Sequence, residues 1–412
     1  MSNNVEFKPT EIGSIPNDWH TTELKDVLTI GHGKPQFAIE NENGKYPILA
    51  TGGILGYTNH YLYNKPSVLI GRKGTIDKPQ YMDTPFWTVD TLFYTHINEK
   101  FNPKFIYYKF HLIDWKRRSE ASGVPSLSSS IINEQIISHP QLPEQQKIAQ
   151  ALTDADNYIS ALEKLIEKKK MMKEGLMVNL LTGKQRLKEF AFNEDGTEKG
   201  YKESELGKIP EDWEIISLPD ILISNGIKIG PFGSQLKKEF LCDSGFKVYG
   251  QENVFINNFE VGNRYINYLH FSNLQSCEIK CNDFLISMMG TIGKVAIVPK
   301  GIQRGIMDSH LIRLRVNQNI YDIEFLKYIF TSELIKKQIS KLTVGGIMDG
   351  LSSKTIKSLF LYLPPLEEQT CLTKYLNVID DELDSLSKKL GKAQNLKNGM
   401  MQKLLTGEIR LA

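Results

Sequence analysis

The chain has 412 residues and a formal charge of only +2, because 50 Lys and Arg residues oppose 48 Asp and Glu residues. This balance excludes a histone-like polycation, although a local basic face remains possible. A mean hydropathy of −0.30 without a run of 18 apolar residues excludes a membrane-spanning helix, and the N-terminus lacks the pattern of a signal peptide. Four cysteines are too few for a disulfide scaffold, so we expect a multidomain cytoplasmic protein.

The first half of the chain opens with a short motif and continues into a β-rich segment. The motif Ile-Pro-x-Asp-Trp stands at 15–19, and residues 20–142 alternate apolar runs such as PSVLIG (66–71) and FWTVDTLFYTHI (86–97) with Gly- and Pro-rich turns. A helical stretch is expected at 105–118. Short strands, turns and a helix in this order predict a compact mixed α/β domain with a twisted sheet.

A long helix is predicted after this segment. Between Pro143 and Gly183 there is no further proline, and apolar residues recur at alternating spacings of four and three. This is the heptad spacing of a helix that packs against another helix. Gly183 closes a Leu-Leu-Thr-Gly segment, where glycine can adopt the left-handed conformation that ends helices.

The second half repeats the first in the same order. Residues 12–28 and 206–222 are identical at eight of 17 positions, and LIGRKGTI (69–76) matches LISMMGTI (285–292). The offset between matching residues grows from 194 to 216 to 224 along the chain, so the insertions lie in the middle of each half. A second helical stretch is expected at 323–339. The predicted fold is a mixed α+β tandem repeat: two globular α/β domains separated by two long antiparallel helices with pseudo-two-fold symmetry.

The two long helices share an apolar seam through which we expect them to pack on each other. The seam comprises Ile148, Leu152, Ile159, Leu162, Ile166, Leu176 and Leu180, followed by Leu372, Leu376, Ile379, Leu383, Leu386, Leu390, Met400 and Leu404. In the second helix it is broken only at Lys397, the counterpart of Lys173 in the first.

Five glycine-rich loops interrupt the β-rich segments, at 31–36, 50–58, 71–75, 228–238 and 288–294. Such loops can present backbone N–H groups and polar side chains to phosphates and base edges, although each could also be an ordinary β-turn. Arginine has the paired donors that guanine binds, although Arg72 could equally be a surface charge. The candidate binding residues on these loops are Lys34, Gln36, Thr51, Arg72, Lys73, Thr75, Ser234, Gln235, Lys237, Lys238, Thr291 and Lys294.

Motifs of catalysis are not found. No GxxxxGK[ST] nucleotide loop occurs, and Asn102-Pro103-Lys104-Phe105 is better explained as a turn before a helix than as a methyltransferase motif. Cys277 and Cys281 lack the second ligand pair of a zinc site. We therefore predict no catalytic residue and no metal site.

The ordered, duplicated set of motifs resembles the specificity (S) subunit of type I restriction–modification systems. The residues that carry the resemblance are Ile-Pro-x-Asp-Trp at 15–19 and 209–213, the Gly-Thr-Ile segments at 74–76 and 290–292, Gly-Pro-Phe-Gly-Ser at 230–234, Leu-Pro-Glu-Gln-Gln at 142–146, and both Leu-Leu-Thr-Gly ends. Asp77 departs from the pattern where the second copy has Gly293, and Thr370 does so where the first copy has Gln146.

The resemblance implies a non-catalytic, cytoplasmic DNA-binding subunit with four regions. These are a first target-recognition domain (1–142), a central conserved helical region (143–199), a second target-recognition domain (200–365) and a distal conserved helical region (366–412). Each recognition domain would read one half of a bipartite double-stranded DNA site, and the helices would set the spacer between the halves.

The implied partners are two modification (methyltransferase) subunits, bound at the helical regions, and restriction (endonuclease and translocase) subunits. S-adenosylmethionine, ATP and Mg²⁺ would belong to those partners, so this chain would bind no cofactor itself. Two alternatives remain open at this point: the recognition portion of another kind of methyltransferase–endonuclease system, or a helical assembly scaffold that does not bind DNA.

Overall fold

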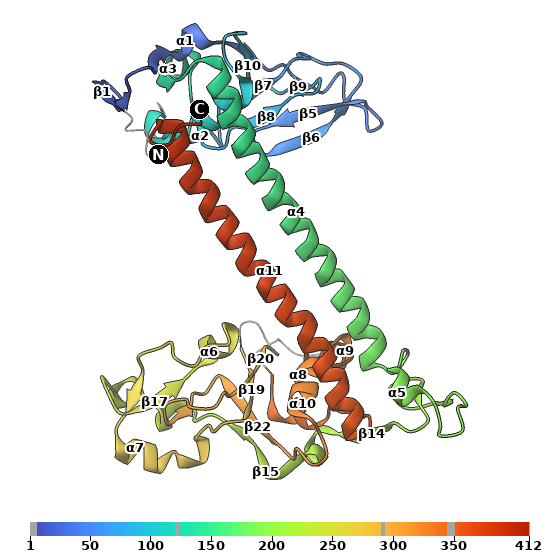
Figure 1. Ribbon diagram of the computed structural model, residues 1–412. Coiled ribbons are helices and arrows are strands. Elements are labelled where there is room, and N and C mark those ends of the chain that lie inside the picture. The colour runs from blue at the N-terminus through green and yellow to red at the C-terminus, as the bar shows by residue number, and fades with distance from the viewer. Residues whose placement is uncertain (1–5, 120–122, 290–292, 344–350, 412) are drawn as a thin grey trace. The chain divides into compact units, whose positions relative to one another are not determined.

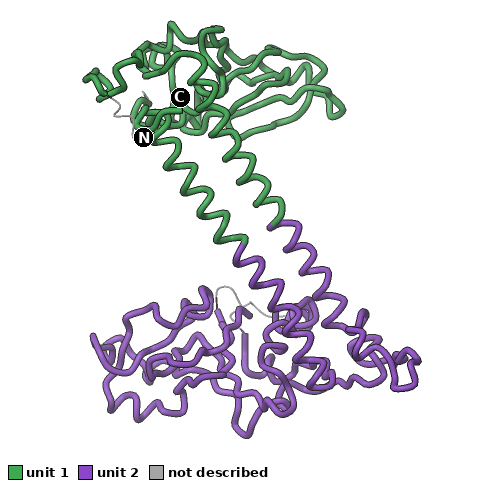
Figure 2. The backbone as a smooth tube through the Cα atoms, in the orientation of Figure 1, with its two compact units in different colours: residues 1–165, 386–412 green, residues 166–385 purple. Residues whose placement is uncertain are grey.

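The computed structural model describes residues 6–119, 123–289, 293–343 and 351–411 (Figure 1). These residues form two compact units: unit 1 comprises residues 1–165 and 386–412, and unit 2 comprises residues 166–385 (Figure 2). No helix among the described residues is long and apolar enough to cross a membrane.

Unit 1 is built on two small sheets. The four-stranded sheet has the order β4 (Leu28–His32), β10 (Leu92–Ile97), β7 (Ser67–Gly71) and β8 (Gln80–Met82), and the three-stranded sheet has the order β6 (Gly53–Thr58), β5 (Tyr46–Ala50) and β9 (Trp87–Thr88). Two shorter pairs complete the unit: β1 (Phe7–Thr10) with β2 (Gly13–Pro16), and β3 (His20–Glu23) with β11 (Ile136–His139). All pairs are antiparallel except β5 with β9.

Unit 2 repeats this plan. Its first four-stranded sheet has the order β15 (Leu222–Ile229), β22 (Leu311–Val316), β19 (Phe284–Ser287) and β20 (Val295–Ile297). A second sheet has the order β16 (Leu241–Cys242), β18 (Tyr265–Ile266), β17 (Phe246–Tyr249) and β21 (Gly305–Met307), and here β17 and β21 are the parallel pair. The shorter pairs are β12 (Tyr201–Lys202) with β13 (Ile209–Pro210), and β14 (Glu214–Ser217) with β23 (Phe360–Leu363).

The helices confirm the predicted mixture of elements. Two are long, α4 (Leu142–Leu181) and α11 (Leu366–Thr406), and each contributes one part to each unit. The short helices of unit 1 are α1 (Leu24–Val27), α2 (Pro103–Leu112) and α3 (Ser129–Asn133). Those of unit 2 are α5 (Lys188–Ala191), α6 (Gln251–Phe255), α7 (Tyr268–Asn273), α8 (Ile323–Thr331), α9 (Glu333–Thr343) and α10 (Ser353–Lys357).

Both predicted short helical stretches are interrupted. The stretch at 323–339 divides at Ser332, which is extended (ψ 162°) and whose hydroxyl donates to the carbonyl of Ile329 at 2.6 Å. The stretch at 105–118 ends as an α-helix at Leu112, because Ile113 is also extended (ψ 128°). Side-chain bonds to the last carbonyls compete with continuation of a helix, and the hydrophobic pattern does not report them.

In each unit, one part of α4 packs against one part of α11. In unit 1, Ile148 and Leu152 share a core with Leu404 and Trp19. In unit 2, Leu180 and Leu372 belong to the core that contains Trp213. The ion pairs between the helices show an antiparallel arrangement in each unit, as expected from the repeat: Asp156 with Lys397 and Glu144 with Arg410 in unit 1, and Lys169 with Glu382 and Lys173 with Asp380 in unit 2.

An arginine beyond the end of each long helix joins three segments. In unit 2, Arg186 binds Asp212 of the Ile-Pro-x-Asp-Trp motif (Nη1–Oδ1 2.9 Å) and Glu368 in the first turn of α11 (Nη2–Oε2 2.5 Å). The Trp213 indole N–H donates to the same carboxylate at 2.9 Å. We call this set the Arg186 cluster.

Unit 1 contains a similar arrangement, which we call the Arg410 cluster, although among the described residues the buried indole N–H of Trp19 has no hydrogen-bond partner. Arg410 binds Asp18 (Nη1–Oδ1 2.7 Å) and Glu144 (Nε–Oε1 2.7 Å). The hydrogen bond from Arg410 holds the pKa of Asp18 below its ordinary value. Burial also differs: the side chains of Arg186 and Glu368 are 4% and 1% exposed, whereas those of Arg410 and Glu144 are 23% and 14% exposed.

The two Leu-Leu-Thr-Gly ends reach these clusters through glycine, as the sequence predicts. Gly183 and Gly407 have φ angles of +69° and +80°. A Cβ on Gly183 would lie 2.5 Å from a ring carbon of Pro210, and a Cβ on Gly407 would lie 2.4 Å from one of Pro16. Conformation and space therefore both require glycine at these helix ends.

The break in the apolar seam also has a structural reason. Lys397 pairs with Asp156 at 2.5 Å, and the Tyr108 hydroxyl donates to the same carboxylate at 2.7 Å. In unit 2, Lys173, Asp380 and Tyr328 make the equivalent contacts. A lysine can occupy the seam because its charge is paired there.

The first prediction compares the two arginine clusters. Arg186→Ala would leave the buried Glu368 without its cationic partner and should destabilise unit 2 by about 3–5 kcal/mol. Arg410→Ala, the matched change in unit 1, should cost only about 1–2 kcal/mol because its partners retain access to water. Hydrogen exchange of peptides from each unit, measured on the full chain, would test both values. Equal losses of protection would show that burial does not set the difference.

The second prediction concerns Lys109, a buried lysine of α2. Its amine donates to the Ser138 hydroxyl (2.9 Å) and to the Leu405 carbonyl of α11 (2.7 Å), and burial lowers its pKa to about 7 from an ordinary 10.5. Between these pH values the unfolded chain binds a proton that the folded chain does not. The free energy of unfolding of unit 1 should therefore rise with pH across this window, by about 1.4 kcal/mol per pH unit.

The control is Lys109→Met, because Met retains the apolar stem and cannot titrate. Urea unfolding at several pH values across the window, followed by hydrogen exchange in unit 1, would measure both slopes. The variant should lack the slope. If it shows the wild-type slope, another group is responsible for it.

Candidate nucleic-acid interface

Loops from separate parts of unit 1 meet at one end of its four-stranded sheet. The backbone N–H of Lys34, just after β4, donates to the Thr88 carbonyl at 2.9 Å, and that of Arg72, just after β7, donates to the Thr91 carbonyl at 2.8 Å. A Cβ placed on Gly74 would lie 3.8 Å from the Thr51 hydroxyl oxygen, so these two loops are neighbours. Since β4 and β7 end where β10 begins, the loops that follow them lie at the same end of the sheet.

Gly33 explains how the loops approach so closely. A Cβ at this position would lie only 1.9 Å from the Val89 carbonyl oxygen, so a larger residue would push the segments apart. The structure thus places the loops that carry the six candidate residues of unit 1 at one end of the four-stranded sheet. Lys34, Arg72 and Lys73 are exposed, whereas Gln36, Thr51 and Thr75 are half-buried. The exposed cationic side chains at this end of the sheet can contact phosphates or the edges of bases.

Asp77, which departs from the family pattern, has a partner of its own. Its carboxylate pairs with Lys116 at 2.7 Å, and the hydrogen bond from Lys116 lowers its pKa. The negative charge next to the Gly-Thr-Ile segment is therefore balanced within unit 1.

Unit 2 places its candidate residues on the corresponding loops. Gly230 follows β15, and a Cβ there would lie 1.7 Å from the Asp308 carbonyl oxygen. Two short 3₁₀ turns, Gly233–Gln235 and Lys238–Phe240, follow this glycine. The exposed candidates of unit 2 are Ser234, Gln235, Lys237, Lys238 and Lys294. Thr291 lies outside the described residues.

Some candidate residues have partners, and others were missed. Lys237 pairs with Glu239 at 3.2 Å across an exposed surface, which leaves its amine accessible to another anion. Exposed aromatic side chains were not predicted: Phe37 is 84% exposed beside the first loop, and Phe232 is 54% exposed after Gly230. The signal was present in the sequence, since both phenylalanines lie in or directly beside the glycine-rich loops from which the candidate residues were drawn.

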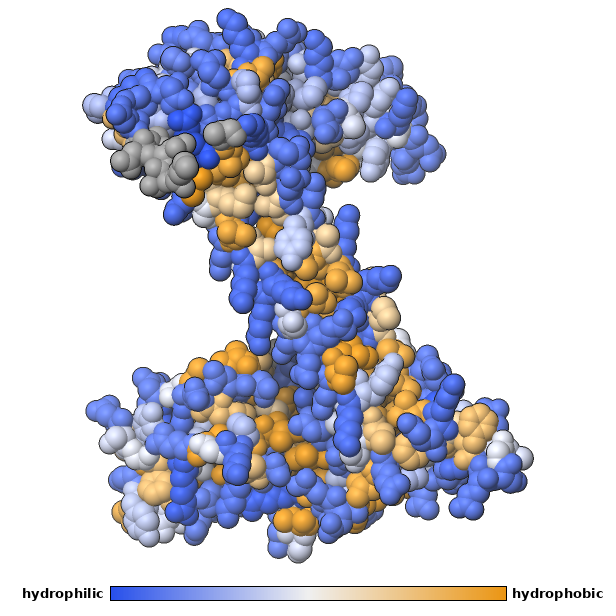
Figure 3. Space-filling view, in the orientation of Figure 1, coloured by the Kyte–Doolittle hydropathy of each residue, from blue (hydrophilic) through white to orange (hydrophobic). Residues whose placement is uncertain are grey.

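The fifteen seam residues of the long helices are all buried or half-buried. Their side chains therefore support the helix pairing within the chain. The surface available to a partner consists of other residues, and apolar side chains remain visible on the helices in Figure 3. Those exposed on the helices include Leu165, Met171, Met172, Val178, Tyr375, Val378 and Leu396.

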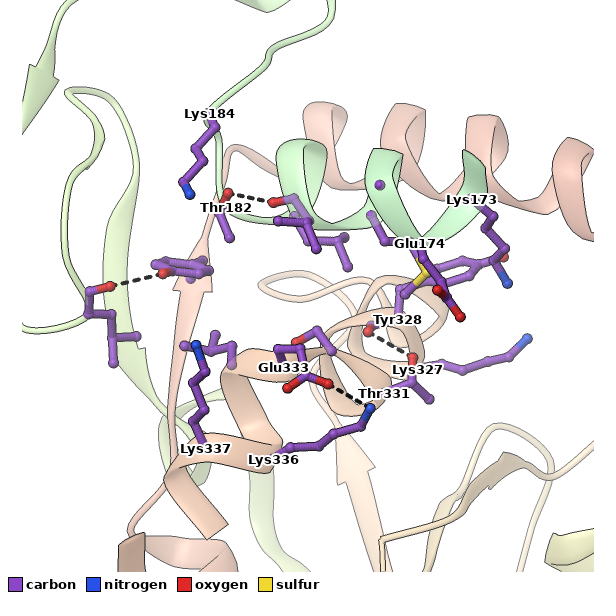
Figure 4. A pocket seen from close by; sticks show the side chains of 18 of the residues that line it. Lys173, Glu174, Thr182, Lys184, Lys327, Tyr328, Thr331, Glu333, Lys336 and Lys337 are labelled. Carbon is purple, nitrogen blue, oxygen red and sulfur yellow. Dashed lines mark hydrogen bonds and ion pairs between the residues drawn. The ribbon is translucent and has the colours of Figure 1, made fainter. Parts of the chain in front are cut away.

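A pocket of about 1480 Å³ opens in unit 2 between α4 and the α8–α9 pair (Figure 4). Met171 and Val178 of α4, which are 58% and 48% exposed, help to line it. Glu333 on its wall pairs with Lys336 at 2.8 Å. The lining lysines are Lys170, Lys173, Lys184, Lys208, Lys327, Lys336 and Lys337. An apolar wall surrounded by cations suits a protein partner with apolar and acidic side chains.

Among the described residues, no group of three His, Cys, Asp or Glu side chains could hold a metal ion. Cys277 is buried and Cys281 is exposed, so their side chains do not share one environment. The two units instead share exposed polar and cationic loop residues at equivalent ends of their four-stranded sheets.

Comparison with known proteins gives one answer. The family model for the type I restriction modification DNA specificity domain matches residues 16–170 and 210–395. The type I restriction enzyme MjaVIII specificity subunit of Methanocaldococcus jannaschii is 27% identical over 437 residues, which span 98% of this chain and 96% of that protein. The EcoBI specificity subunit of Escherichia coli is 22% identical over 428 residues, spanning 96% and 87% of the two chains.

A solved structure shows the same fold. The S subunit of the type I restriction–modification system from M. genitalium has a TM-score of 0.62 at 16% identity, and the match covers 98% of this chain and 97% of that one. The family match includes both halves of the repeat. It does not favour the alternative that the chain is a helical scaffold without DNA recognition. This chain therefore belongs to the specificity subunits of type I restriction–modification systems, the non-catalytic subunits that recognise DNA sequence.

Proposed function

We propose that each unit reads one half of a bipartite double-stranded DNA site. The observation that carries this proposal is the duplicated four-stranded sheet. At the equivalent end of this sheet, both units present polar and cationic loop residues. Backbone contacts hold these loops, as at Gly33 and Gly230, and leave many of their side chains exposed. Residues 1–142 and 200–365 would be the target-recognition domains, and residues 143–199 and 366–412 would be the helical regions whose length sets the unread spacer.

The partners follow from the same proposal. Two modification subunits would bind the helical regions, where the lysine-lined pocket of unit 2 and the exposed apolar side chains of α4 and α11 offer contact surface. Restriction subunits would join them in the cytoplasm. S-adenosylmethionine, ATP and Mg²⁺ would be bound by those subunits, and this chain would contribute DNA recognition without a cofactor.

The third prediction is that specificity is modular. Exchanging residues 20–142 for the corresponding segment of a relative should change one half of the methylated motif and leave the other half intact, because each unit contains its own sheet and loops. Methylome sequencing of the host that carries the exchanged chain would report the motif. A change in both halves would contradict separate readout.

The fourth prediction distinguishes base contacts from phosphate contacts. Arg72→Ala should weaken binding by about 1–3 kcal/mol and relax the preference at one base pair, because a bidentate donor would be lost. Lys237→Ala should weaken binding to all sequences alike and reduce the slope of log K against log salt by about one. Titrations of the full chain with matched and mismatched duplexes at several salt concentrations would measure both effects. Wild-type affinity, salt slope and base preference in Arg72→Ala would exclude the base contact.

A further inference from the structure

The turn after β7 in unit 1 holds Arg72 by two backbone hydrogen bonds. The Arg72 N–H donates to the Thr91 carbonyl at 2.8 Å, and the Leu127 N–H donates to the Arg72 carbonyl at 2.9 Å. Both partners lie outside the turn, so the backbone of Arg72 is positioned by the surrounding fold. Its side chain and that of Lys73 are exposed.

The turn after β19 in unit 2 makes the same two bonds at Met288. The Met288 N–H donates to the His310 carbonyl at 2.9 Å, and the Leu351 N–H donates to the Met288 carbonyl at 3.0 Å. Ladder registers agree, because Gly71 of β7 faces Leu92 and Ser287 of β19 faces Leu311. Met288 therefore occupies the place of Arg72, and Met289 occupies the place of Lys73.

The side chains at this shared place have different chemistry. Unit 1 presents two cations, whereas unit 2 presents Met289, which is 46% exposed. Phe232, 54% exposed, stands on the neighbouring loop of unit 2. That loop is anchored at Gly230, whose N–H donates to the Leu311 carbonyl at 3.1 Å, one residue from the anchor of Met288. Two apolar side chains are thus exposed on adjacent loops of unit 2.

The donors of Arg72 and Lys73 suit guanine, which offers the O6 and N7 acceptors in the major groove. A methionine or phenylalanine side chain offers no such donor. The apolar group that the major groove presents is the 5-methyl group of thymine. Exposed Lys294 and Lys237 lie on the same two loops of unit 2, where they can neutralise phosphates around an apolar contact.

We propose that the two units recognise different base chemistry: unit 1 contacts guanine through Arg72, and unit 2 contacts thymine methyl groups through Met289 and Phe232. This inference rests on the proposed function, because it assigns base classes to the two half-sites of the same DNA.

The experiment uses the full-length chain and a duplex selected from a random library by that chain. Exchange of residues 20–142 identifies the half-site of unit 1, and the remaining half belongs to unit 2. Thymines are then replaced by deoxyuridine, which lacks only the methyl group, in one half at a time. Each contacted thymine in the unit 2 half should cost about three- to fourfold in affinity, the value for one buried methyl group of about 0.8 kcal/mol. The same replacement in the unit 1 half should have no comparable effect.

Variants assign the effect to the named side chains. Met289→Ala should bind more weakly and should lose the discrimination between thymine and deoxyuridine at one position. Met289→Leu, which keeps an apolar side chain of similar size, should retain that discrimination and shows that the turn tolerates substitution. In the unit 1 half, 7-deazaguanine should weaken binding by the wild-type chain but not by Arg72→Ala.

Three outcomes distinguish this inference from the proposed function on which it rests. Loss of affinity with deoxyuridine in the unit 2 half alone, abolished by Met289→Ala, supports the inference. Deoxyuridine without effect in the unit 2 half, or a methyl effect that persists in Met289→Ala and Phe232→Ala, overturns it while sequence-selective binding, and hence the proposed function, stands. If the full chain selects no sequence from the library, the proposed function itself fails.

Discussion

Ion pairs at the ends of the long helices, buried in unit 2 and partly exposed in unit 1, are the interaction on which the rest of this structure depends. Arg186 and Arg410 each bind one carboxylate of an Ile-Pro-x-Asp-Trp motif and one in the first turn of the other long helix. A charge removed from water requires such partners, so separating the segments of unit 2 would leave Glu368 buried without a cation, whereas separating those of unit 1 would break partly exposed ion pairs. Because the Arg410 cluster includes Asp18, residues near the two ends of the chain are held in one unit.

Both long helices are divided between the two units. Unit 1 combines residues from both ends of the chain, whereas unit 2 is the continuous segment 166–385, and each unit takes one part of α4 and one part of α11. In unit 1 the buried Lys109 adds a second connection, because it donates to the last turn of α11 at Leu405. Unit 2 has Ile329 at the equivalent place, next to Tyr328, so the repeat keeps its geometry while the chemistry of individual contacts differs.

The candidate loops of the two units show the same combination of constant backbone and variable side chains. Glycine at 33 and at 230 lets a loop lie against a neighbouring carbonyl, and backbone hydrogen bonds then position the turns that follow β7 and β19. Since the turn backbones are held by the fold, side chains on these loops can change without altering the sheet that carries them. Arg72 and Met288 are an example of unlike side chains on matched backbone.

Much of the architecture could be predicted from local pattern and repetition. The duplicated motifs predicted two similar halves, the heptad spacing predicted paired long helices, and Gly183 and Gly407 were expected at helix ends, because each of these features depends on neighbouring residues in the sequence. The candidate loops could be named for the same reason, although their role in binding DNA is still a prediction.

The tertiary structure decided which distant residues meet. From sequence periodicity, Lys173 and Lys397 could be identified only as breaks in the apolar seam. Their pairing with Asp380 and Asp156 depends on how the two helices are aligned along each other. Lys109 lies within an ordinary amphipathic stretch, and its burial follows from the docking of α11. The exposure of Phe232 and Met289 on adjacent loops likewise depends on strand order. Local propensity therefore determined the elements, while long-range packing and the desolvation of charge determined how they were joined.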